Sequence, residues 1–144
     1  MKTIFFITLL IPFLSYSASL TLSGNPPPLK IEKATAGFQP ESCKESSTSY
    51  SIQVNPHQKI SILAALASPM DPHTSLKISL TAPSFAESFP LSLQTKAQPV
   101  VINILEGKHE NLSISYEYEA LVKAGIIQLS QKTIIFTLLE TSNH

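Results

Sequence analysis

The feature that most constrains the fold is a period of two in the placement of apolar residues along most of the chain. In Ser75–Leu80 (SLKISL), apolar residues are separated by single polar ones. Side chains of a β-strand point alternately to the two faces of a sheet, so this pattern predicts strands with one face in the core and one in water. The same alternation occurs in residues 49–54, 59–66, 89–94, 99–105, 111–120 and 132–140, and more weakly in 29–38.

Turn-forming residues separate these segments. Asn55-Pro56-His57 and Glu106-Gly107-Lys108 are examples, and most prolines lie between segments, where a sheet tolerates them. Segment 59–66 is rich in Ala and Leu, but its β-branched start and the following Pro69 favour a strand over a helix. We therefore predict an all-β fold, an antiparallel sandwich or barrel of seven or eight strands.

The first 18 residues have the layout of a secretory signal peptide. Lys2 gives a positive start, Ile4–Leu14 (IFFITLLIPFL) is apolar, and small residues follow up to Ser19. The apolar segment is shorter than the roughly 20 residues that a membrane-spanning helix needs, and no later segment is long enough. We expect cleavage near Ala18 and no transmembrane segment afterwards. A retained signal anchor is the alternative.

The predicted signal peptide is followed by an arm and then by one domain. Three consecutive prolines, Pro26 to Pro28, favour an extended chain, so we expect residues 19–28 to form an arm. Within it, Leu20 and Leu22 alternate with polar residues and are candidates for binding a partner protein. The predicted organisation is a signal peptide (1–18), a proline-rich arm (19–28) and a β-sandwich domain (29–144).

Charge and cysteine content restrict the partners and the compartment. All ten basic residues are lysines and are balanced by ten acidic residues. Arginine is the residue best suited to phosphates and base edges, so nucleic acid is not an expected partner. Cys43 is the only cysteine. Small secreted eukaryotic domains usually depend on disulfides, which favours a bacterial exported protein here. Cys43 is then an unpaired thiol or a candidate for an intermolecular disulfide.

The strongest candidates for catalysis are Glu117 and Glu119 in the segment NLSISYEYEALVKAG. Two residues apart on a strand, their side chains point the same way, about 7 Å apart. Catalytic carboxylate pairs flank a cleft and keep one acid desolvated. Tyr116 and Tyr118 alternate with the glutamates, and their large aromatic side chains are more readily buried in the core than ionised carboxylates. We predict that the tyrosines face inward and the glutamates face solvent.

No other pattern predicts a catalytic, cofactor or metal site. There is no nucleophile motif and no glycine-rich phosphate loop. The histidines fall in expected turns or at the terminus, without the spacing of local metal ligands. They are His57, His73, His109 and His144. We therefore predict a non-enzymatic protein without cofactors.

The last part of the chain, Asn111–Glu140, resembles the end of bacterial exported immunoglobulin-like domains of the pilin-like and spore coat U types. The resemblance depends on a tyrosine-x-tyrosine strand, on Ala124-Gly125, and on Lys132–Leu139 (KTIIFTLL) as a final strand. The usual cysteines are absent, and Ile126 replaces a tyrosine after the turn glycine. The resemblance implies an immunoglobulin-like β-sandwich used as a surface or fibre subunit.

Two functions are compatible with these features. The first is an exported structural or adhesive surface protein, a pilin-like or coat-like subunit that binds protein and self-associates by strand addition or through loops. The alternative is a periplasmic or secreted binding module that uses loops at one end of the sandwich, such as Ser68–Thr74 and Glu106–Asn111. Both predict a secreted, periplasmic or cell-surface location in a bacterium.

Overall fold

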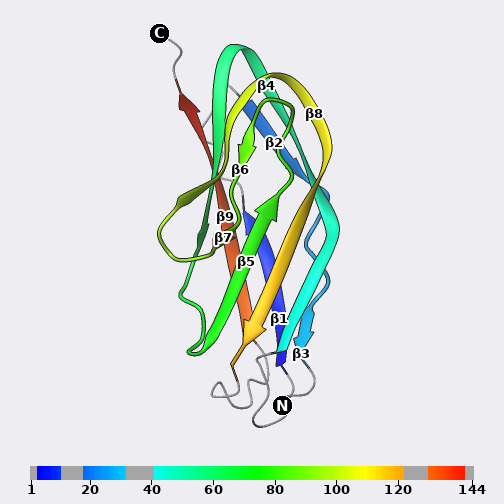
Figure 1. Cartoon of the computed structure of the whole chain (residues 1–144), viewed down its shortest axis with the longest axis vertical. Coiled ribbons are helices and arrows are strands. Elements are labelled where there is room, and N and C mark those ends of the chain that lie inside the picture. The colour runs from blue at the N-terminus through cyan, green and yellow to red at the C-terminus, as the bar shows by residue number, and fades with distance from the viewer. Residues whose placement is uncertain (1–2, 11–17, 32–40, 122–129, 142–144) are drawn as a thin grey trace.

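The computed structural model describes residues 3–10, 18–31, 41–121 and 130–141. Within these ranges the fold is all-β and has no helix, which confirms the predicted class (Figure 1). The strands are β1 (Thr3–Leu10), β2 (Ala18–Leu22), β3 (Leu29–Ile31), β4 (Glu41–Leu66), β5 (Thr74–Leu80), β6 (Glu87–Ser88), β7 (Leu91–Ser92), β8 (Gln98–Ala120) and β9 (Ser130–Thr141). The rest of segment 29–38 and the expected Ala124-Gly125 turn lie outside the described residues.

All nine strands belong to one sheet. Its order is β3-β1-β9-β4-β8-β5-β7, with β2 paired to β4 and β6 paired to β8. Each pairing is antiparallel except that of β1 with β9, which is parallel. The sheet is therefore mixed, and the prediction of purely antiparallel pairing was wrong. The difference arises because the N-terminal segment, assigned to a signal peptide, contributes a strand.

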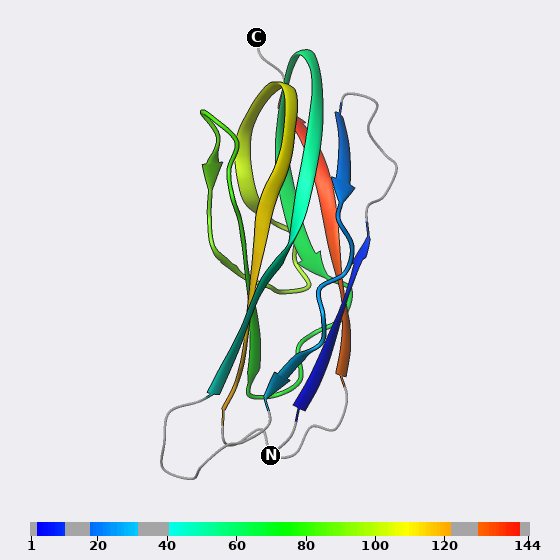
Figure 2. The same cartoon turned by 90° about the vertical axis from the view of Figure 1, so that its right-hand side faces the viewer.

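The two longest strands each combine two of the predicted segments. In their ladder, Val54 pairs with Gly107 and Lys59 with Leu105, so residues 55–58 lie opposite Glu106 alone. The turn residues at this point bend the β4–β8 pair without ending it. The sheet consequently curls over, and Figure 2 shows β1 and β9 facing β5 and β8 across the interior.

The core lies inside this curl. The rings of Phe5 on β1 and Tyr118 on β8 stack across it, with centroids 4.7 Å apart and an interplanar angle of 20°. Most of the apolar faces predicted by alternation are buried, which confirms them. The buried members are Tyr50, Ile52, Val54, Ile60, Ile62, Ala64, Leu66, Leu76, Ile78, Leu80, Leu93, Val100, Ile104, Ile114, Tyr116, Tyr118, Ala120, Ile134 and Phe136.

Segment 89–94 is an exception to the strand predictions. Only Leu91 and Ser92 pair, with Ile78 and Lys77 of β5, and Phe89 remains exposed. Proline has no N–H group to donate, and Pro90 lies directly before the pair. The alternation is therefore real but supports only a two-residue edge strand.

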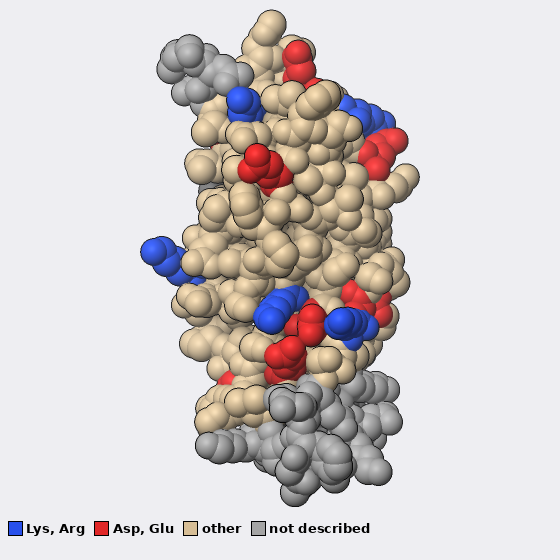
Figure 3. All heavy atoms as spheres, in the orientation of Figure 1, with Lys and Arg blue, Asp and Glu red and all other residues tan. Residues whose placement is uncertain are grey.

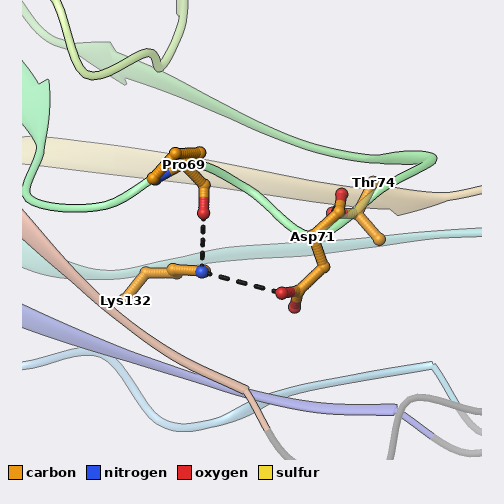
Figure 4. A network of polar contacts seen from close by, with 4 residues as sticks. All are labelled: Pro69, Asp71, Thr74 and Lys132. Atoms are coloured by element: carbon orange, nitrogen blue, oxygen red, sulfur yellow. Dashed lines mark hydrogen bonds and ion pairs between the residues drawn. The ribbon is translucent and has the colours of Figure 1, made fainter.

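Lys132 of β9 fastens the loop between β4 and β5 (Figure 4). Its Nζ donates a hydrogen bond to the carbonyl oxygen of Pro69 at 2.6 Å and lies 3.7 Å from Oδ1 of Asp71. The Lys132 side chain is 11% exposed and that of Asp71 35%. The Thr74 hydroxyl donates to the carbonyl oxygen of Asp71 at 2.6 Å. The loop 68–74, predicted as a binding loop, is thus held against the sheet.

Candidate functional site

The N-terminal strand β1 occupies a slot in the sheet between β9 and β3. Phe5–Leu10 pairs with Ser130–Ile135, and Thr3–Phe5 pairs with Leu29–Ile31. Phe5 and Ile7 are buried in the core. In the whole chain, the segment assigned to a signal peptide therefore supplies a strand. Its removal stays a prediction, and removal would leave the neighbouring edge of β9 without a partner strand.

The arm residues Leu20 and Leu22 lie on β2, which covers an edge of β4. Leu20 pairs with Ile52 and Leu22 with Tyr50, and both leucines are half-buried against the core. The hydroxyl of Ser23 then accepts a hydrogen bond from the Ser49 amide at 2.9 Å. The structure thus places the predicted partner-binding residues on their own sheet, and they would have to leave β4 to reach another chain.

Cys43 lies on β4, opposite Tyr118 in the ladder with β8. It is unpaired in this chain, half-buried and packed against the core. Leu22 lies opposite Tyr50, well along β4 from Cys43, so the structure does not bring the thiol and the arm together. A disulfide to another chain stays a prediction.

Glu117 and Glu119 lie on the outer face of β8, whereas Tyr116 and Tyr118 are buried as predicted. Glu117 stands between two lysines, because it pairs with Lys44 of β4 and with Lys77 of β5. Figure 3 shows basic and acidic side chains side by side on this face. Glu117 and the two lysines, together with serines, line a shallow hollow of about 310 Å³. Glu117 therefore belongs to an alternating row of charges, whereas Glu119 pairs with serines on both neighbouring strands.

Burial perturbs the ionisation of three core tyrosines. Desolvation raises the pKa of Tyr116 and of Tyr118 to about 12, and it also raises the pKa of Tyr50. The Tyr50 hydroxyl donates a hydrogen bond to the carbonyl oxygen of Thr81. These groups remain neutral at ordinary pH and act as core residues.

The Glu117 position provides a test of the charge pattern. Glu117→Lys would place three lysines in a cross-strand row, and we expect it to lower the free energy of unfolding by about 1–2 kcal/mol at low salt. The loss should shrink at high salt because exposed charges are screened. Glu119→Lys is the matched control, since Glu119 pairs with Ser42 and Ser75. Equal losses for the two variants in urea unfolding would contradict this account.

A second hollow, of about 460 Å³, lies at the end of the molecule where β4 and β8 bend. The backbone amide of His57 donates to Oε2 of Glu106 at 3.0 Å, which ties the two bends together. The Nε2 of His109 donates to the carbonyl oxygen of Leu105 at 3.0 Å. The hollow is lined by His57, Gln58, Ser84, Phe85, Leu105, Glu106 and His109, and we call it the bend hollow.

Sequence analysis identified only part of the bend hollow. Glu106 and His109 belong to the predicted loop 106–111, although His109 lies within β8 and not in a turn, because the ladder continues through the bend. Phe85 was missed. The sequence feature that could have identified Phe85 is its position: it is an aromatic residue directly after the turn cluster Ala82-Pro83-Ser84 and outside every alternating segment.

Neither a protein-family model nor a curated protein matches the chain. In the parts of the chain that the structure describes, no helix has the length and apolar character needed to cross a membrane. Among the same residues, no three histidine, cysteine or acidic side chains lie together in a way that could hold a metal ion.

Proposed function

We propose that this protein is an exported, non-enzymatic structural or adhesive surface protein of a bacterium. In this proposal it is a pilin-like or coat-like subunit with an immunoglobulin-like sandwich, which binds other chains by strand addition. The curl of the sheet, which sets two layers face to face, supports the sandwich (Figure 2). The observation that carries the function is the pairing of the leader-like β1 with the C-terminal strand β9.

Loss of the leader would create an acceptor site for a strand. Without residues 1–18, the edge of β9 would present unpaired N–H and C=O groups, and the space filled by Phe5 and Ile7 would be open. Such an edge binds an extended segment through main-chain hydrogen bonds, and side-chain pockets at alternate positions select the segment.

The arm has the pattern that this slot requires. On β1, Phe5 and Ile7 are buried and lie two residues apart. On β2, Leu20 and Leu22 have the same spacing and are half-buried against the core. The arm of a second copy would therefore place apolar side chains at alternate positions of the slot, while its main chain pairs with β9.

The size distribution of three chain lengths tests this function. We expect the chain 19–144 to form concentration-dependent polymers in sedimentation velocity, because it has both the arm and the open slot. The chain 26–144 lacks the arm residues that form β2, and the whole chain 1–144 has a filled slot, so both should remain monomeric. A folded, monomeric 19–144 chain at every concentration would overturn the proposal.

Point substitutions in the arm give a matched control without truncation. Leu20→Ser with Leu22→Ser removes the apolar side chains and should abolish the polymers of the 19–144 chain. Ser19→Ala with Thr21→Ala changes the alternate, exposed positions and should leave the polymers intact. Loss of polymers in both double variants would indicate an effect of the arm unrelated to strand insertion.

A second candidate function is favoured by the bend hollow. It is a periplasmic or secreted binding module whose site is formed by loops and bends at one end of the sandwich. Rigid strands hold these bends, and sites on a rigid scaffold are commonly formed by such connections. The two functions use different surfaces of the molecule, so one protein can have both.

A further inference from the structure

The bend hollow lies where three segments of the chain meet. It is formed by the bends of β4 and β8 and by the turn of residues 83–86, which Figures 1 and 2 show at the same end of the molecule. Its volume of about 460 Å³ is in the range of small-molecule sites. No arginine or lysine lines it, so its hydrogen-bonding groups come from uncharged or acidic residues and histidines.

Phe85 is the most unusual residue of this hollow. The amide of Ala86 donates to the carbonyl oxygen of Pro83 at 3.1 Å, so Phe85 is the third residue of a tight turn. Its φ of 67° is in the left-handed region, where glycine or asparagine is favoured and a bulky residue is rare. Its side chain is nevertheless 87% exposed. The turn therefore keeps an aromatic ring exposed to water, and the left-handed backbone of Phe85 lowers stability. Strained backbone conformations of this kind are common at functional sites.

The groups around the ring are hydrogen-bonding groups held in place by the backbone. Glu106 is fixed by the His57 amide, and its carboxylate has further acceptor capacity. Nε2 of His109 is engaged by the carbonyl oxygen of Leu105, so Nδ1 is the ring nitrogen left for a ligand. Leu105 is partly exposed and extends the apolar surface. The hollow thus combines an apolar, aromatic surface with a rim of acceptors.

We propose that the bend hollow binds a neutral saccharide, one or two sugar units at the end of a glycan. A sugar ring has an apolar face of C–H groups, which are partially positive and pack against the negative face of an aromatic ring such as Phe85. Its edge carries hydroxyl donors, which match the acceptors on Glu106 and His109. The absence of basic lining residues disfavours acidic sugars.

This inference deepens the second candidate function and does not depend on strand addition. The arm variants that test polymerisation lie on β2, and the residues that line the bend hollow lie on other segments. Polymerisation and saccharide binding can therefore succeed or fail separately.

The test is a titration of the isotope-labelled whole chain, followed by NMR, with the methyl glycosides of glucose, galactose, mannose and N-acetylglucosamine. We expect at least one sugar at millimolar concentration to give saturable shifts at Phe85, His57 and Glu106. Phe85→Asn suits the turn but removes the ring, so it should weaken binding about tenfold or more while raising the melting temperature. Phe85→Tyr keeps a ring and should bind within about threefold of the original chain.

Phe89→Ala is the matched control, because Phe89 is an exposed aromatic residue outside the hollow. It should leave sugar binding unchanged. The proposal is overturned if none of the sugars shifts these resonances, or if binding survives Phe85→Asn. Saturable shifts with phenylalanine amide but with no sugar would also overturn it, since they would assign the hollow to an apolar side chain of a protein partner.

Discussion

Replacing Phe5 by alanine in the whole chain is expected to lower the free energy of unfolding by about 3–5 kcal/mol. Phe5 is fully buried and its ring stacks on Tyr118 across the core. Truncation would remove the burial of a large side chain and leave a cavity inside the curled sheet. The measurement is chemical unfolding of the uncleaved chain, followed by circular dichroism.

Phe6→Ala is the control from the same strand. Phe6 is 37% exposed and points to the opposite face of β1, so its loss should cost much less than that of Phe5. Both substitutions remove a phenyl ring from β1. The two positions differ in the face of the strand on which the ring lies, so a difference in stability would show that β1 is paired in the sheet. Equal and small effects would mean that residues 3–10 do not contribute to the folded core.

Asp71→Asn is expected to lower the free energy of unfolding by about 2–3 kcal/mol. The ammonium group of Lys132 is largely removed from water, and Asp71 is its only acidic partner among the described residues. Without the carboxylate, Lys132 keeps the hydrogen bond to Pro69 but has no compensating negative charge. The loop 68–74 would lose part of its attachment to β9, and faster hydrogen exchange there should accompany the lower stability.

The converse substitution, Lys132→Met, separates charge from packing. It removes the buried charge and keeps an apolar side chain of similar length, so we expect a change of less than about 1 kcal/mol. In the double variant, the effect of Asp71→Asn should largely vanish, because no buried charge remains to be compensated. A cost for Asp71→Asn that is undiminished in the Lys132→Met background would contradict the ion-pair explanation.

Local pattern was sufficient for much of the fold. Tyr116 and Tyr118 were assigned to the core and Glu117 and Glu119 to the outer face from alternation alone, because a strand has only two faces and burial of ionised carboxylates is costly. The same logic identified nearly every core position from Tyr50 to Phe136. It did not show that Glu117 stands between two lysines, since cross-strand neighbours depend on the pairing register, which no single segment contains.

The candidate sites were predicted less completely. The loop 106–111 was predicted as a binding loop from its turn residues, and this stays a prediction. The other residues that line the bend hollow come from β4 and from the turn at Phe85. Leu20 and Leu22 were predicted, from their alternation with polar residues, to be partner-binding residues of an extended arm. Their pairing with β4 was not foreseen, because a five-residue strand can pair with any free edge of suitable length.

The sequence by itself determined the all-β class, the inward face of most strands, and the absence of an internal disulfide, since each depends on residue types and a two-residue period. Only the tertiary structure decided three further features. The turn residues at 55–58 bend a continuous ladder, Pro90 shortens an edge strand, and the leader-like segment pairs in parallel with β9. These features depend on contacts between residues far apart in the chain. Whether such contacts are favourable depends on which strand edges and apolar faces the rest of the fold leaves exposed. The periodicity of a single segment does not contain this information.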